Sequence, residues 1–390
     1  MIYLDHNATT PIRPEVLETM LPCFGELSGN PSSIHGAGQA ARAAIDRARG
    51  AVAAALGSAP EEVHFTSGGT EADNWAIKGV AAACEHSAGR GSRSPRIVTS
   101  AIEHHAVWHS CRYLAQAAGV EVTYLPVDEF GRVSAASVAS ALGEDVILLS
   151  IMHANNETGV IQPVAEIGRL ARERGIPFHV DAVQALGKID VKVDELGADL
   201  VSVSAHKING PKGTGALYIR RGTEIEPLAH GGDHEGGVRA GTENVAGIVG
   251  FGRAVELRQG APADRERAAV EKMRDRLEAG VSAAMEGVSV NGHPRERVGN
   301  TSSISFAGVE AEAILVGLDL EGVAISSGSA CTAGTTEPSH VLLAMGLEPR
   351  RAASAVRFSL GWGNTDAEID RLIELLPPLV ARLRRISTGA

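Results

Sequence analysis

The stretch V-I-L-L-S-I-M-H-A-N-N-E-T, residues 146–158, holds the pattern that decides the fold. Its first six residues are almost wholly apolar, as expected of a strand buried on both faces in a parallel sheet covered by helices. The polar cluster H-A-N-N-E-T (153–158) follows directly. Because ligands bind beyond the carboxyl ends of the strands in open α/β sheets, this cluster is predicted to line a crevice.

Similar apolar runs alternate with helical stretches on both sides of this segment. The further strands expected are Arg96–Ser100, Val122–Val127, Pro177–Asp181, Asp199–Ser204 and Gly215–Arg220. The helices expected cover residues 38–57, 71–84, 104–117, 134–142 and 163–174. The alternation predicts an α/β fold with a mostly parallel central sheet flanked by helices. The clusters D-A-V-Q (181–184) and S-A-H-K (204–207) also follow strands, so they should share one crevice with H-A-N-N-E-T.

After about residue 258 the pattern changes to that of a smaller α+β domain. Helices are expected over 264–285, 310–320 and 366–385, with strands at Val288–Asn291, Thr301–Phe306 and Ala355–Ser359. A chain of 390 residues is also long for a single hydrophobic core. We therefore expect a large domain over residues 15–258 and a small domain formed by 1–14 and 259–390, which carries the loop around Cys331.

The bulk properties narrow the classes of function. A formal charge of −11 and a pI of about 5.7 argue against a nucleic-acid-binding surface, which normally needs a basic stripe. No apolar run approaches the length of a membrane span, and the N-terminus lacks a signal-peptide pattern. None of the four cysteines forms a C-x-x-C pair. We expect a cytoplasmic protein with reduced thiols, with no membrane and no direct nucleic-acid partner.

Two charged residues at neighbouring strand ends suggest cofactor chemistry. Lys207, in S-V-S-A-H-K-I-N-G-P-K-G-T-G (202–215), could be partly desolvated and act as a Schiff-base nucleophile. Alternatively, it is a surface lysine beside a glycine-rich turn. Asp181 ends an apolar strand, where a carboxylate needs a cation such as a protonated pyridine nitrogen, unless it only caps the following helix. The proximity of Lys207 and Asp181 favours a cofactor site.

Two further motifs could complete such a site. The glycines of S-G-G-T-E (67–71), ahead of a helix, could let backbone N–H groups bind a phosphate, although a simple capping box is the alternative. A histidine of E-H-H-A (103–106) could stack on a planar cofactor and move protons. His105 and His109 have the spacing of a metal pair, but no third ligand is placed to complete it, so no metal is expected.

Cys331 lies in the most suggestive thiol context, S-S-G-S-A-C-T-A-G-T-T (326–336). A structural cysteine normally sits among apolar neighbours, whereas this one has small and hydroxyl-bearing neighbours. A thiol on such a loop can become a thiolate, attack, and carry a product outward. Cys23, Cys84 and Cys111 lie in apolar or helical contexts and are expected to be structural.

Taken together and in order, the motifs resemble those of a known family. They are Y-L-D-H-N-A-T-T-P (3–11), G-N-P-S-S-I-H (29–35), F-T-S-G-G-T-E-A-D-N (65–74), H-A-N-N-E-T-G (153–159), H-V-D-A-V-Q (179–184), S-A-H-K-I-N-G-P-K-G-T-G (204–215), R-A-G-T-E-N (239–244), S-S-G-S-A-C (326–331) and V-R-F-S-L-G (356–361). This set resembles the group I, NifS/IscS-type cysteine desulfurases, a class V branch of the fold-type I pyridoxal-phosphate (PLP) enzymes. The resemblance extends from residue 3 to about residue 361.

The resemblance implies roles for the residues around the cofactor ring. Lys207 would bind PLP covalently, and Asp181 would pair with the pyridine nitrogen. Gln184 would donate a hydrogen bond to the ring phenolate oxygen. His104 would stack on the ring and, like Lys207, move protons as a group that titrates near neutrality. Asn156 would contact both the phenolate side of the ring and the substrate.

It also implies roles at the phosphate and at the substrate. The phosphate would be held by Gly69, Thr70, Ser204 and His206. Thr242 would reach the phosphate of a neighbouring subunit, which implies a homodimer with shared active sites. Arg357 would bind the substrate carboxylate through a two-pronged contact. Cys331 would attack the sulfur atom of the bound L-cysteine.

The implied reaction converts L-cysteine to L-alanine and leaves the sulfur as a persulfide on Cys331. A sulfur-acceptor protein would then take it, most simply for iron–sulfur cluster assembly. The sequence leaves open a role in tRNA thiolation or in DNA phosphorothioation. It also leaves open selenocysteine lyase as the enzyme class and a non-catalytic scaffold as a different class of function.

Overall fold

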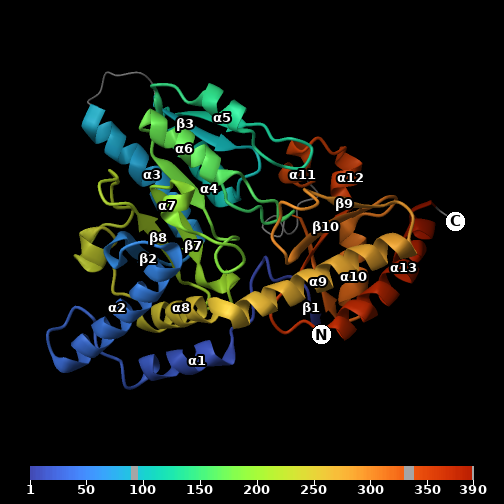
Figure 1. Cartoon of the computed structure of the whole chain (residues 1–390), viewed down its shortest axis with the longest axis horizontal. Coiled ribbons are helices and arrows are strands. Elements are labelled where there is room, and N and C mark those ends of the chain that lie inside the picture. The colour runs from blue at the N-terminus through green and yellow to red at the C-terminus, as the bar shows by residue number, and fades with distance from the viewer. Residues whose placement is uncertain (89–94, 329–337, 389–390) are drawn as a thin grey trace.

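A seven-stranded sheet forms the centre of the larger part of the molecule (Figure 1). The computed structural model describes residues 1–88, 95–328 and 338–388. The sheet order is β2 (Val63–Thr66), β8 (Gly215–Ile219), β7 (Leu200–Ser204), β6 (Phe178–Asp181), β5 (Val146–Ser150), β3 (Arg96–Ser100) and β4 (Glu121–Leu125). Strand β8 alone runs in the direction opposite to the other six strands. The predicted mostly parallel sheet is confirmed, and β2 is an additional strand at its edge.

Helices cover both faces of this sheet because successive strand residues point to opposite sides. One face carries α3 (Gly69–Ala88) and α4 (His105–Ala118), and the other carries α2 (Gly36–Leu56), α5 (Ala135–Ala141), α6 (Val164–Arg174) and α8 (Val245–Leu257). Ile97 and Leu148 are buried under the first pair of helices. Their chain neighbours Val98 and Leu149 are buried under the second group. This two-sided burial explains the nearly continuous apolar character of the strands.

Helix α8 was not predicted from the sequence. It contains three glycines within V-A-G-I-V-G-F-G, and glycine lowers helix propensity. The structure supplies the reason for at least one of them, since a Cβ atom on Gly252 would come within 2.7 Å of the Cα atom of Ala48 in α2. Close packing of α8 against α2 therefore outweighs the local preference.

The smaller part is built on a four-stranded antiparallel sheet, in agreement with the predicted α+β character. Its order is β12 (Ser326–Ser327), β13 (Ala355–Ser359), β10 (Thr301–Phe306) and β9 (Val288–Asn291). The helices packed with it are α9 (Gly260–Ala284), α10 (Ala311–Asp319) and α13 (Asp366–Thr388), and they share one apolar core with β10 and β13. Figure 1 shows α9 as the long gold helix that leads from α8 along this smaller part.

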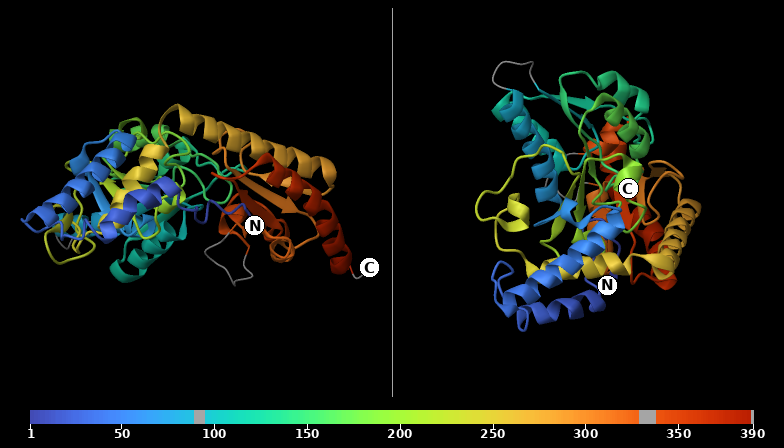
Figure 2. Two further views of the ribbon diagram at one scale, coloured as in Figure 1. Left: turned by 90° about the horizontal axis from the view of Figure 1, so that it is seen from below. Right: turned by 60° about the vertical axis from the view of Figure 1, so that its left-hand side comes forward.

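Two features join the parts at the crevice. A small apolar cluster combines Ile102 and Met152 from the large-sheet side with Val341 and Leu342 of α11 (His340–Ala344). The N-terminal strand β1 (Ile2–Tyr3) pairs with β11 (Val323–Ala324), so the N-terminus lies on the small-sheet side (Figure 2). The chain then crosses to the large sheet, where the N–H of Thr10 donates to the carbonyl oxygen of His206 at 2.9 Å.

Candidate active site

A cavity of about 540 Å³ lies at the carboxyl ends of the parallel strands, between the two parts of the molecule. Residues of all three predicted polar clusters line it, so the prediction of one shared crevice is confirmed. The predicted site residues found in its wall are Gly69, Thr70, His104, Asn156, Asp181, Gln184, Ser204, His206, Lys207 and Arg357.

Two predicted residues are not among those that line the cavity. Thr242 is exposed on the surface of this chain. Cys331 lies outside the residues that the structure describes. Ser339, in the next described stretch, contacts the site: its hydroxyl donates to Glu157 Oε2 at 2.5 Å, and Glu157 lines the cavity.

Lys207 follows β7 and points toward the N-terminal segment. Its Nζ donates to the carbonyl oxygens of Asn7 at 2.6 Å and Ala8 at 2.9 Å. It lines the cavity and is only partly exposed, so it is not the fully solvated surface lysine of the alternative interpretation.

Asp181 ends β6 and is 5% exposed. Its Oδ1 accepts the backbone N–H of Val183 at 2.9 Å, within a series of turns and not a helix. Burial raises the pKa of Asp181 to about 6, while this hydrogen bond and the charge of Lys207 hold it down. The carboxylate is therefore charged at neutral pH and available to a buried cation.

Two other buried acids near Asp181, Asp73 and Glu103, also have raised pKa values. Burial and the nearby Asp181 raise the pKa of Asp73 well above its ordinary value. Burial raises the pKa of Glu103 to about 8, although Ser100 and the N–H of Met152 donate to it. Burial also lowers the pKa of His179 to about 3. The pKa of Asp181, about 6, therefore lies below that of Glu103, about 8.

His104 caps the N-terminus of α4, and its Nδ1 accepts the N–H of Ala106 at 3.2 Å. The ring proton must therefore lie on Nε2. Burial, followed by the charge of Lys207, lowers the pKa of His104 to about 4. The expectation that His104 titrates near neutrality is thus wrong for this arrangement, because a buried imidazole beside a lysine stays neutral.

The neighbouring histidines stack and do not converge on a metal. The rings of His105 and His109 lie 4.9 Å apart, and the ring of His340 lies 5.0 Å from that of His105. Within residues 1–88, 95–328 and 338–388, no group of three His, Cys, Asp or Glu side chains is arranged to hold a metal ion. The same residues include no helix long and apolar enough to cross a membrane.

One end of the cavity fits a phosphate. Gly69 and Thr70 begin α3, whose first backbone N–H groups have no partner within the helix. A Cβ atom on Gly69 would lie 2.6 Å from Cγ2 of Val183, so only glycine leaves this approach open. The Ser204 hydroxyl is buried without a hydrogen-bond partner, as expected of a group whose acceptor is an absent anion.

The other side of the cavity fits a carboxylate. Arg357 comes from the middle of β13 and is 1% exposed. Its guanidinium donates to Asp5 Oδ1 at 2.8 Å and to the carbonyl oxygen of Asn156 at 3.0 Å. Its Nε is buried and has no hydrogen-bond partner. A buried guanidinium with an unused donor is suited to bind a further anionic oxygen.

Several residues of the cavity wall were not assigned a role from the sequence. Asn7, Asp73, Glu157 and His340 all line the cavity. Asn7 and Glu157 belong to the quoted motifs Y-L-D-H-N-A-T-T-P and H-A-N-N-E-T, where a run of polar residues was the available signal. Asp73 could have been noticed as an acid followed closely by the apolar residues of α3.

The α/β fold and the cavity at the ends of its strands agree with the family to which the sequence belongs. Residues 2–372 match the model of the aminotransferase class-V family, and the chain belongs to that family, whose members depend on PLP. It is 48% identical over 386 residues to a protein named cysteine desulfurase IscS from Methanosarcina thermophila, covering 99% of this chain and 93% of the relative.

Solved structures with the same fold support the assignment to this family. A NifS-like protein superposes with a TM-score of 0.88 at 38% identity, and the match covers 100% of both chains. A structure of SspA in complex with cysteine superposes with a TM-score of 0.81 at 36% identity, covering 93% of this chain and 99% of the other.

Proposed function

We propose that the protein is a PLP-dependent cysteine desulfurase, which converts L-cysteine to L-alanine and holds the sulfur as a persulfide on Cys331. The observation that carries the proposal is the cavity in which Lys207, a charged and buried Asp181, and Arg357 with a free donor converge. The identity of nearly half the residues to a cysteine desulfurase, along almost the whole chain, supports the same activity.

The residues present fit the cofactor. Lys207 would bind it covalently, Asp181 would pair with the ring nitrogen, and the ring would lie against His104. The Ser204 hydroxyl and the N-terminus of α3 would hold the phosphate, with His206 beside them. When bound, PLP withdraws electrons from the substrate carbons and so weakens the bonds that must break.

Arg357 would hold the carboxylate of L-cysteine. Its side chain already donates to Asp5 and to the Asn156 carbonyl, so the guanidinium plane is fixed before substrate arrives. Pre-ordered donors in a buried site bind an anion more strongly than flexible ones because less side-chain entropy is lost.

Cys331 would then take the sulfur atom. Its thiolate forms a new S–S bond to the substrate sulfur while the C–S bond breaks, and the electron pair of the broken bond stays on the carbon. Protonation of that carbon completes alanine. The Lys207 amine and the neutral His104, whose proton lies on Nε2, are the groups placed to hold and move protons in the cavity.

The functional unit would be a homodimer. Thr242 is exposed in a single chain, and in a dimer it would reach the phosphate of the neighbouring site. Leu17, Leu21, Phe24 and Ile34 are large apolar side chains exposed on the α1 (Pro14–Met20) region. Such a patch suits burial between subunits. Sedimentation of the holoenzyme should give twice the mass of one chain, and a monomer would exclude shared active sites.

The persulfide would pass to an acceptor protein in the cytoplasm, and we propose iron–sulfur cluster assembly as its use. The acceptor can be identified by purifying the protein from its own cells under anaerobic conditions. Recovery of a cluster scaffold would support this use. Recovery of a tRNA-modifying or DNA-modifying protein without a scaffold would assign the sulfur to those pathways instead.

The activity is tested by anaerobic incubation with L-cysteine and a reductant, with alanine and sulfide measured together. Equal yields that disappear in Cys331→Ser, but persist in the matched control Cys84→Ser, are expected. Turnover of L-cysteine by Cys331→Ala would overturn the proposal. No alanine from a protein with bound cofactor would point to selenocysteine or cysteine sulfinate as the substrate.

A further inference from the structure

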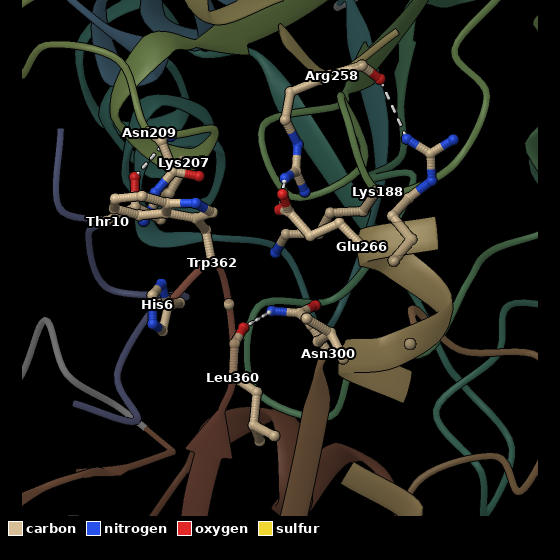
Figure 3. A pocket seen from close by; sticks show the side chains of 14 residues that line it. His6, Thr10, Lys188, Lys207, Asn209, Arg258, Glu266, Asn300, Leu360 and Trp362 are labelled. Carbon is tan, nitrogen blue, oxygen red and sulfur yellow. Dashed lines mark hydrogen bonds and ion pairs between the residues drawn. The ribbon is translucent and has the colours of Figure 1, made fainter. Parts of the chain in front are cut away.

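A second, smaller cavity of about 40 Å³ shares Lys207 with the candidate active site and contains another lysine, Lys188 (Figure 3). Arg258 and Glu266, which also line it, form an ion pair with each other at 2.5 Å. Lys188 belongs to no ion pair within the described part of the chain. An amine inside a protein without an acidic partner is costly, so its contacts call for an explanation.

Lys188 contacts the amide of Gln184, one turn earlier in the segment after β6. Its Nζ donates to Gln184 Oε1 at 2.6 Å and to Asn7 Oδ1 at 3.0 Å. The Gln184 Nε2 in turn donates to the carbonyl oxygen of Asn7 at 2.9 Å. A carbonyl can only accept, so it requires the nitrogen end of the amide, and the lysine requires the oxygen end.

These two contacts allow only one orientation of the Gln184 amide. Turning the amide over would place its NH₂ group against a donor and its oxygen against an acceptor. In the observed orientation, one N–H of Gln184 is used by Asn7, and the other remains for an acceptor in the cavity that Gln184 lines.

The Asn7 side chain is itself held in place, so it is a firm support for Lys188. The Asn300 amide donates to Asn7 Oδ1 at 3.0 Å, and the Asn7 amide donates to the Thr301 hydroxyl at 2.8 Å. Asn300 in turn donates to the carbonyl oxygen of Leu360 at 3.1 Å. The network therefore ties the Gln184 amide to the small sheet through Lys188 and Asn7.

We propose that Lys188 is a positioning residue, which fixes the Gln184 amide so that it offers an N–H group, and not its oxygen, to the phenolate oxygen of the bound cofactor. The proposal rests on the proposed function. Burial, with the charges of Lys207, Arg258 and Arg357, lowers the pKa of Lys188 well below its ordinary value. A neutral amine still has two hydrogens, so both contacts to oxygen persist in either protonation state.

The test follows the visible absorption of the purified holoenzyme as a function of pH. A hydrogen-bond donor to the phenolate oxygen stabilises the ionised form of that oxygen. It therefore lowers the midpoint pH of the change in absorption. Lys188→Met, which keeps the length but has no donor, should raise this midpoint by about one unit. The side chain of Lys188→Gln is too short to reach Gln184, so this variant should raise the midpoint as Lys188→Met does. Lys188→Arg keeps a donor and should have a midpoint close to that of the wild type.

A double-mutant cycle separates this role from a general effect of charge or folding. Gln184→Leu alone should shift the midpoint as Lys188→Met does, and the two changes together should shift it no further. An additive double variant would overturn the proposal, because Lys188 would then act independently of Gln184. So would an unchanged midpoint in Lys188→Met with the cofactor bound. A wild-type protein that binds no PLP would instead overturn the proposed function.

Discussion

The two sheets meet at one cavity but supply it in different ways. The seven-stranded sheet contributes residues at or just beyond the ends of its strands, with Asp181 at the end of β6 and Lys207 after β7. The antiparallel sheet contributes Arg357 from the middle of β13. A parallel sheet brings the carboxyl ends of its strands, and the residues after them, to one side of the sheet. Here the antiparallel sheet contributes a side chain from within a strand, because strand side chains project from the sheet faces. The large sheet is thus suited to hold a cofactor and the small sheet to hold a substrate.

The largest expected loss of activity comes from replacing Lys207, the lysine that follows β7 of the large sheet. Lys207→Ala should lower L-cysteine turnover by about 10³-fold or more, because the proposed covalent link to the cofactor and the proposed proton carrier would both be lost. The measurement is alanine formed per enzyme, with Lys272→Ala, at an exposed position of α9, as the control. Turnover within tenfold of the wild type would remove Lys207 from the mechanism.

Replacing Asp181, the carboxylate at the end of the neighbouring strand β6, should cause the next largest loss of activity. Asp181→Asn keeps the shape of the side chain but not its charge, so the proposed ion pair with the protonated ring nitrogen would be lost. We expect kcat to fall by roughly 10²- to 10³-fold, with a smaller change in KM, because the loss concerns the reaction and not the binding of cysteine. Steady-state kinetics with saturating PLP would measure both constants. A change confined to KM would contradict the division between the sheets.

The opposite pattern is expected on the small sheet. In Arg357→Lys the positive charge remains, but an ammonium group cannot reproduce the contacts to Asp5 and Asn156 while binding a carboxylate. The KM for L-cysteine should rise by roughly 10- to 100-fold, with a smaller change in kcat. If kcat fell as much as in Asp181→Asn while KM stayed constant, Arg357 would belong with the catalytic residues of the large sheet.

The same contrast between the two sheets explains which parts of the fold and of the site could be predicted from the sequence. The apolar strands, and the polar residues directly after them, follow from a local pattern. This is why Lys207 and Asp181 could be placed in one crevice before the structure was known. Arg357 lies within an ordinary strand, and nothing local marks it, so its role came from resemblance to a family. Long-range contacts, such as that between Arg357 and Asp5, leave no periodic signal.

The buried acids show a second limit. Nothing in the sequence distinguishes Asp73 and Glu103 from other acidic residues, and their raised pKa values arise from burial and from the nearby charge of Asp181. The titration of His104 was predicted incorrectly for the same reason. A pKa depends on the desolvation and the charges that the fold creates, which a motif does not contain.

The last prediction concerns the pH dependence of the unfolding free energy, in which the two parts of the molecule should also differ. All the buried carboxyl groups of the described chain belong to residues 1–258, and none belongs to the small-sheet part. Glu103 is the clearest case, since its folded-state pKa is about 8 against an ordinary value of 4.5. Between these two values the unfolded chain releases the proton that the folded chain keeps, so stability falls as pH rises through this window.

Glu103→Gln cannot titrate and should remove this part of the pH dependence. From pH 5 to pH 8, these two pKa values correspond to a loss of unfolding free energy about 3–4 kcal/mol larger in the wild type than in the variant. Urea unfolding at the two pH values measures the difference, and Glu18→Gln at an exposed position of α1 should behave like the wild type. Equal losses in Glu103→Gln and the wild type would mean that Glu103 is charged in the folded protein, and that other groups cause the pH dependence of stability.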